Sequence, residues 1–246
     1  MFLANLNSSQ RFQDSNVTIQ VRLFLSCNSS RPLGSSYNVI GQVNGTEWPE
    51  QVVLLGGHID SWDVGSGAMD DGGGIVACYF ALHTLQKLGL FPKRTIRVIG
   101  WVDEENTGAG EKAYFASLSA LELSQHVLAI ESDSGVFNPT SFTKTDDATP
   151  GQSQLLHEIV TYLMKGVGRT QMQIVTSDGG ADTDLLREAG VPVSELLSDG
   201  SKYFWYHHSD ADTIDKLNSD EVADCVSALA ILIHIVADYP IPFNSL

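Results

Sequence analysis

From residue 51 onward, apolar runs of strand length alternate with segments of helical periodicity, and this alternation constrains the fold more than any other feature. Two shorter strands, 17–25 and 37–43, are expected ahead of it. Because strands that alternate with helices form a mostly parallel sheet covered on both faces, we predict an α/β fold with a mixed, mostly parallel central sheet. The later predicted strands are 51–58, 94–105, 126–133, about 172–175 and 191–197, and the predicted helices are 75–88, 110–118, 153–165 and 220–236, the last capped by Ser219.

Polar residues collect where three of these predicted strands end. His58 ends the first, Glu104 and Glu105 end the second, and Asp133 ends the third. In open α/β sheets, ligands bind at the carboxyl edge of the strands. We therefore expect these side chains to meet at one rim of the sheet.

The stretch GGHIDSWDVGSGAMDDGGG at 56–74 is rich in glycine and contains four aspartates. It has no lysine, so it is not a phosphate-binding P-loop, and Asp70 takes the place of the last glycine in a dinucleotide fingerprint that would start at Gly65. Its acids would repel phosphate and attract cations. Glycines permit a tight loop, which could bring one carboxylate between two cations.

Histidine among carboxylates favours zinc over Ca²⁺ or Mg²⁺, which prefer oxygen ligands alone. Several clustered carboxylates are balanced better by two divalent ions than by one. Two ions about 3.5–4 Å apart can hold a bridging hydroxide and polarise a carbonyl, while a carboxylate that is not a ligand acts as general base. Any single aspartate of this kind is most often a turn or cap residue, so the prediction rests on the whole set.

Five motifs, in this order and spacing, resemble those of the co-catalytic di-zinc exopeptidases of the aminopeptidase and glutamate carboxypeptidase superfamily: GGHIDSWD…GAMDDGGG, DEE, ESDSG, TDLLREAGVP and HHSDADT. The resemblance covers about residues 36–246 and implies the zinc-exopeptidase fold. It implies two zinc ions per chain, with Asp70 as the bridging ligand. The implied ligands are His58 and Asp133 for one ion, and Glu105 and His208 for the other.

The resemblance also implies catalytic roles. Glu104 would be the general base, and Asp60 would orient His58, a role that metal-site chemistry expects as well. The reaction would be hydrolysis of short peptides or dipeptides by a metal-bridging hydroxide. Asp71 would shape the loop, since relatives have a cis peptide there, and Asp184 would support the site.

Two ligand assignments have rivals. His207 competes with His208, and Glu131 competes with Asp133; in both pairs the family motif favours the second residue. The remaining polar residues of these segments are expected on the surface or in loops: Asp63, Asp178, Asp182, Asp210 and His157.

The net charge argues against two classes of binding partner. Thirty acidic residues against 14 basic ones give a formal net charge of −16, so nucleic acid and anionic membrane surfaces are poor partners. The most apolar run, 228–237, is too short for a membrane span and predicts a buried helix.

N-x-S/T sequons begin at Asn7, Asn16, Asn28 and Asn44, which indicates a glycosylated flank and a secreted or lysosomal protein. The opening MFLANLNSSQRF has no signal-peptide core, so we expect a chain truncated at its amino end. We divide it into 1–35, a remnant of an upstream protease-associated domain with a linker, and 36–246, the catalytic domain. The family likeness suggests a homodimer.

Two other functions stay open. One is a transferase like glutaminyl cyclase, which by resemblance shares the fold but uses a single zinc ion and lacks the ligand at the position of His58. The other is a non-catalytic protein on the same scaffold, which truncation would favour if it removed part of the substrate pocket.

Overall fold

The structure is a computed structural model that describes residues 34–164 and 172–246. Within these residues, seven strands form one sheet in the order β1-β3-β2-β4-β7-β5-β6. Strands β3, β2, β4 and β7 run parallel, whereas β1 pairs antiparallel with β3, and β5 pairs antiparallel with β7. The predicted mixed, mostly parallel sheet is confirmed. The strands are β1 Val39–Val43, β2 Trp48–His58, β3 Arg94–Trp101, β4 His126–Glu131, β5 Pro139–Lys144, β6 Gln173–Thr176 and β7 Val193–Ser198.

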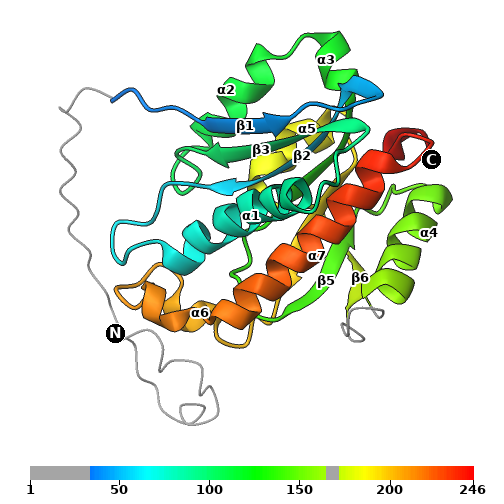
Figure 1. The fold of residues 1–246 in the computed structure, drawn as a ribbon. Helices are drawn as coiled ribbons and strands as arrows, with labels where there is room; N and C mark the ends of the chain where they lie inside the picture. Colours follow the sequence, from blue (N-terminus) through cyan, green and yellow to red (C-terminus); the bar gives the residue numbers. More distant parts are fainter. Residues whose placement is uncertain (1–33, 165–171) are drawn as a thin grey trace, which may run out of the picture. The chain divides into compact units, whose positions relative to one another are not determined.

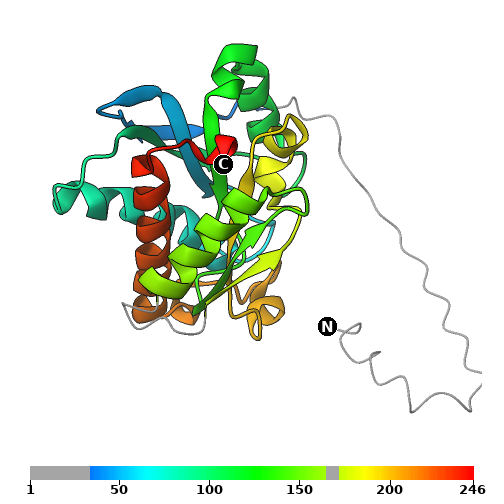
Figure 2. The same cartoon turned by 90° about the vertical axis from the view of Figure 1, so that its right-hand side faces the viewer.

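Helices cover both faces of the sheet, as predicted. On one face, α1 and α7 lie side by side (Figures 1 and 2), and they pack with α4 against Val53 and Leu55 of β2. On the other face, α2 and α5 pack against Val52 and Leu54, the alternate residues of the same strand. The helices are α1 Gly73–Lys87, α2 Ala109–Ser117, α3 Ala120–Ser124, α4 Pro150–Glu158, α5 Asp184–Glu188, α6 Tyr203–Tyr206 and α7 Ser219–Asp238.

Several elements differ from their predictions, among them the short helices α3, α5 and α6, which were not predicted. Strand β3 ends at Trp101, so Glu104 and Glu105 lie in the turn that follows it. Helix α7 is capped by Asn218 and not by Ser219, because the Asn218 side chain accepts hydrogen bonds from the backbone N–H groups of Asp220 and Glu221. Strand β5 was not predicted.

The sequence of β5, PTSFTK, has no apolar run. Thr143 in this strand is satisfied by neighbours on β7: the Ser194 hydroxyl donates to the Thr143 carbonyl, and the Glu195 N–H donates to the Thr143 hydroxyl, both at 2.8 Å. The strand therefore depends on pairing partners distant in sequence, which periodicity does not report.

The apolar run 228–237 lies in α7 and is largely buried, as predicted. No helix within the described residues is long and apolar enough to cross a membrane. Residues 36–246 make up one compact unit. The predicted strand 17–25, three of the four sequons and nearly all of the proposed 1–35 remnant lie outside the described residues.

Candidate metal centre

Three parallel strands bring the predicted ligands to one rim. In the sheet register, His58 at the end of β2 lies opposite Trp101 at the end of β3, and Gly56 lies opposite Glu131 at the end of β4. The chain segments that leave these strand ends therefore start side by side. They carry Glu104, Glu105 and Asp133 into the same small volume.

His58 is fully buried and has a fixed orientation. Its Nδ1 donates to the main-chain carbonyl of Asp60 at 2.9 Å. That bond leaves Nε2 facing carboxylates, 3.2 Å from Asp70 Oδ1, 3.5 Å from Asp133 Oδ1 and 4.0 Å from Glu104 Oε2. A histidine whose second nitrogen is hydrogen-bonded in this way is typical of metal ligands.

Asp70 lies in a segment, Ala68–Gly72, that departs from helical geometry at Asp70 and Asp71. A cis peptide joins these two residues. Asp212 fixes this segment, because its carboxylate accepts the backbone N–H of Met69 at 2.7 Å and that of Asp70 at 3.2 Å. The Asp70 carboxylate is thereby held toward His58.

The segment 207–213 approaches from the other side of Asp70. His208 Nε2 lies 2.7 Å from Glu105 Oε2 and 3.5 Å from Asp70 Oδ2. His207 Nε2 lies 3.4 Å from the same Asp70 oxygen, so both rival histidines reach Asp70. Of the two, His208 also contacts Glu105.

Gly65 allows the loop after β2 to pack closely against this segment. Its φ is +83°, and a Cβ there would lie 2.5 Å from the Ser209 carbonyl oxygen. Next to it, Ser66 donates both its N–H and its hydroxyl to the Asp212 carbonyl, at 2.8 and 3.0 Å. This glycine thus permits a close approach that any side chain would block.

Asp60 holds two parts of the site together. Its main-chain carbonyl, and not its carboxylate, accepts the hydrogen bond from His58; the carboxylate is 3.9 Å from Nδ1. The carboxylate instead accepts the backbone N–H groups of Glu104 at 3.2 Å and Glu105 at 3.4 Å. It therefore positions the turn that carries both glutamates.

Two expectations for the TDLL segment are wrong. Asp184 is about half exposed and pairs with Arg187 at 3.6 Å, away from the metal centre. Asp182, which we expected on the surface, is buried, and its backbone N–H donates to Glu131 Oε2 at 2.9 Å. One Glu131 oxygen is thus engaged by the Asp182 backbone, whereas Asp133 Oδ1 lies 3.5 Å from His58 Nε2.

Buried oxygens without a hydrogen-bond partner show that the donor set fits cations. Within the described residues these include Asp70 Oδ2, Asp133 Oδ1 and Glu105 Oε1. Donor atoms of His58, Asp70 and Asp133 lie within 4.8 Å of one another, and so do those of Asp70, His207 and His208. Two groups of mixed nitrogen and oxygen donors that share Asp70 suit two neighbouring transition-metal ions.

Burial and neighbouring charges shift the pKa values of these groups. Burial, reinforced by the charge of Asp133, raises the pKa of Glu104 to about 7. Burial also raises the pKa of Asp182 to about 8, with the charge of Glu104 adding to the effect. Burial lowers the pKa of His58, but its hydrogen bonds to Asp133 and Asp70 outweigh that and raise it well above its usual range.

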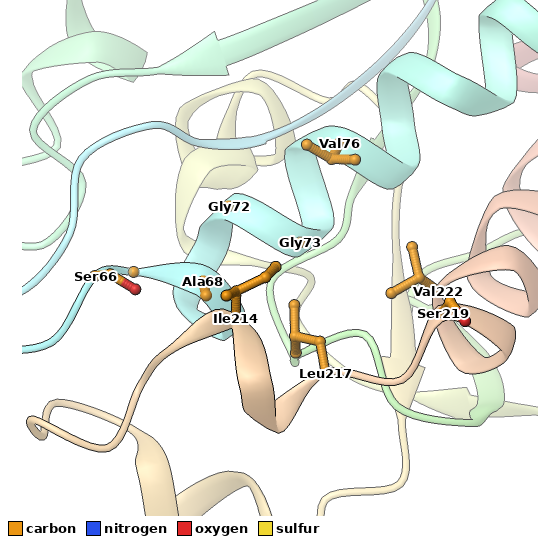
Figure 3. Close-up of a pocket in the computed structure, with 10 residues that line it drawn as sticks. Ser66, Ala68, Gly72, Gly73, Val76, Ile214, Leu217, Ser219 and Val222 are labelled. Carbon is orange, nitrogen blue, oxygen red and sulfur yellow. The ribbon is translucent and has the colours of Figure 1, made fainter.

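An apolar cavity of about 570 Å³ lies beside the Asp70 segment (Figure 3). None of the candidate metal ligands lines it, so it is separate from the metal centre. Its lining residues are Ser66, Gly67, Ala68, Gly72, Gly73, Val76, Ile214, Leu217, Ser219 and Val222.

Comparison with known proteins agrees with this geometry. The model of the family described as "Peptidase family M28" matches residues 38–233. Human carboxypeptidase Q is 38% identical over 207 residues, which are 84% of this chain and 43% of the human protein. The solved structure of a peptidase M28 precursor from Shewanella amazonensis SB2B superposes with a TM-score of 0.76 at 35% identity, covering 84% of this chain and 46% of that one.

A zinc aminopeptidase from Bacillus subtilis shares the fold, with a TM-score of 0.68 at 17% identity over 85% of this chain and 52% of that one. The chain spans a little under half the length of human carboxypeptidase Q and of the Shewanella protein.

Proposed function

Because the chain belongs to peptidase family M28, we propose that it is a zinc-dependent exopeptidase that hydrolyses short peptides, including dipeptides. The observation that carries this proposal is the meeting of His58, Asp70, Glu105, Asp133 and His208 at one rim of the sheet. The similarity to carboxypeptidase Q supports the reaction class, and the fold shared with a zinc aminopeptidase supports the choice of zinc.

The five side chains would hold two ions, with the Asp70 carboxylate between them. His58 and Asp133 would hold one ion, and Glu105 and His208 the other. Bound zinc supplies Lewis-acid polarisation of the scissile carbonyl and lowers the pKa of water at the site.

Glu104 is the residue that moves the proton. Its carboxylate lies 4.0 Å from His58 Nε2, and its backbone is anchored by Asp60. A carboxylate that is not a metal ligand and lies beside the bound water can accept a proton and release it again. Glu104 would take a proton from the attacking water and deliver it to the leaving amine.

The test replaces Glu104 with glutamine, which keeps the shape of the side chain but cannot accept the proton. We expect Glu104→Gln to retain two zinc ions per chain and to lose about 10²–10⁴-fold in kcat on a dipeptide panel. The exposed Glu50→Gln is the matched control and should retain both. Full turnover by the metal-loaded Glu104→Gln protein would contradict the assignment.

Metal analysis of the unmodified chain separates the proposal from its rivals. A content near two ions supports the exopeptidase, a content near one supports the single-zinc transferase, and two bound ions without turnover support a non-catalytic scaffold. We further propose that the protein acts in the secretory pathway or lysosome, and that it is a homodimer.

A further inference from the structure

His208 lies within a column of four aromatic rings. The Trp62 indole stacks on it with ring centroids 4.1 Å apart and planes within 2°. His207 stacks on it at 3.6 Å and 18°. Tyr203 continues the column beyond His207 at 5.0 Å and 31°. These contacts fix the plane of the His208 ring and leave its Nε2 pointing at Glu105.

The two histidines of the centre are therefore oriented by different means. His58 is fully buried and donates a hydrogen bond from Nδ1 to a main-chain carbonyl. The side chain of His208 is about one third exposed, and within the described residues its Nδ1 has no such bond. Stacking takes the place of the hydrogen bond that usually holds a metal-binding histidine.

The backbone on both sides of the stack is tied together. Trp62 belongs to the loop after β2, and three residues later Gly65 packs against the Ser209 carbonyl next to His208. Ser66 then donates two hydrogen bonds to Asp212. The loop therefore presents the indole to the imidazole as a preformed surface.

We propose that Trp62 is a positioning residue for His208: it holds the imidazole plane so that Nε2 meets a metal ion shared with Glu105. This inference rests on the proposed function, because it assigns the residue a role toward the second ion. An imidazole bound to a cation is electron-poor, so it stacks more favourably on the electron-rich indole face. Metal binding at His208 and the stack should thus reinforce each other.

The first test measures zinc affinity in the whole chain by competition with a chromophoric chelator. We expect Trp62→Leu, which keeps apolar bulk but loses the flat ring, to bind one of its two zinc ions about tenfold more weakly and the other unchanged. Trp62→Phe should stay within about threefold of the unmodified chain, because a ring still stacks. Trp205→Leu is the matched control, since Trp205 is 70% exposed and lies outside the column, and it should bind both ions normally.

The second test measures intrinsic tryptophan fluorescence during zinc addition. If Trp62 only stabilised the fold, its emission would not respond to zinc. Zinc addition should alter the tryptophan emission of the unmodified chain and of Trp205→Phe, but not that of Trp62→Phe. Two results would overturn the inference. One is unmodified affinity for both ions in Trp62→Leu. The other is a zinc-induced change of emission in Trp62→Phe as large as that of the unmodified chain.

The two proposals fail separately. An unmodified chain that holds fewer than two zinc ions refutes the proposed function, and the role of Trp62 falls with it. An unmodified chain that holds two ions, alongside a Trp62→Leu protein that also holds two at equal affinity, refutes only the role of Trp62.

Discussion

Among single residues, Asp212 gives the clearest prediction, because its carboxylate holds the backbone of the proposed metal-binding loop and is not itself a proposed ligand. Both of its carboxylate oxygens accept backbone N–H groups, from Met69 and Asp70. In Asp212→Asn, one oxygen becomes an NH₂ group that faces a donor. We expect zinc affinity to fall about 10–100-fold and the unfolding free energy to fall by about 1–3 kcal/mol.

Chelator competition and urea unfolding measure these two effects. The matched control is Asp210→Asn, which changes an exposed acid two residues away and should leave both quantities unchanged. Equal zinc affinity in Asp212→Asn and the unmodified chain would show that the loop keeps its shape without this carboxylate.

The convergence of His58, Glu104, Glu105 and Asp133 could be predicted from the sequence, because these residues follow strand ends that parallel topology brings together. The residues that position them could not. Asp212 acts on backbone N–H groups 143 and 142 residues away, and Asp60 acts on the turn 44 residues ahead; no local pattern encodes either contact. The family motif implied a supporting acid at Asp184, but that residue is about half exposed and pairs with Arg187, whereas the neighbouring Asp182 is buried.

Among the secondary-structure elements, the start of α7 gives a direct comparison of two neighbouring residues. The Asn218 side chain accepts two backbone N–H groups of the first turn, whereas Ser219 is already within the helix. We expect Asn218→Ala to reduce the unfolding free energy by about 1 kcal/mol and Ser219→Ala to change it by less than about 0.5 kcal/mol. Urea unfolding of the two variants under identical conditions measures the difference, and the reverse order would restore Ser219 as the cap.

Elements with their own periodicity were predicted, and those that depend on distant partners were not. Strands β2 and β4 are buried on both faces and are continuous apolar runs, so their positions follow from composition. Strand β5 is stabilised by a hydroxyl and a backbone N–H of β7, which donate to Thr143. Strand β3 ends at Trp101, and the turn that follows it carries Glu104 and Glu105, whose backbone N–H groups donate to Asp60. Contacts between residues distant in sequence therefore determine both where β5 forms and where β3 ends.

For the whole molecule, the buried acids predict how stability depends on pH without metal. The folded-state pKa is about 8 for Asp182 and about 7 for Glu104 and Glu195, all raised chiefly by burial. The folded chain therefore holds more protons than the unfolded chain between about pH 4 and pH 8, and stability falls as pH rises through this window. The raised pKa of His58 acts with the same sign above its unfolded value of 6.5.

Urea unfolding in chelator at pH 5 and at pH 8 measures this effect. We expect the metal-free chain to lose on the order of a few kcal/mol between the two pH values, and added zinc to reduce the loss, because its charge favours the ionised form of the acids around it. Asp182→Asn should reduce the slope, because one of the buried acids is gone. A metal-free chain that is more stable at pH 8 than at pH 5 would refute the account.

The long separation between the halves of the metal centre has a consequence for biosynthesis. The ribosome delivers the Asp70 loop well before the segment that clamps it, since Met69 and Asp212 are 143 positions apart. A nascent chain that has not yet released residues 207–212 lacks the segment that fixes the Asp70 backbone and contacts its carboxylate. The proposed ion held by Glu105 and His208 would therefore bind only after both segments have been synthesised and have folded together.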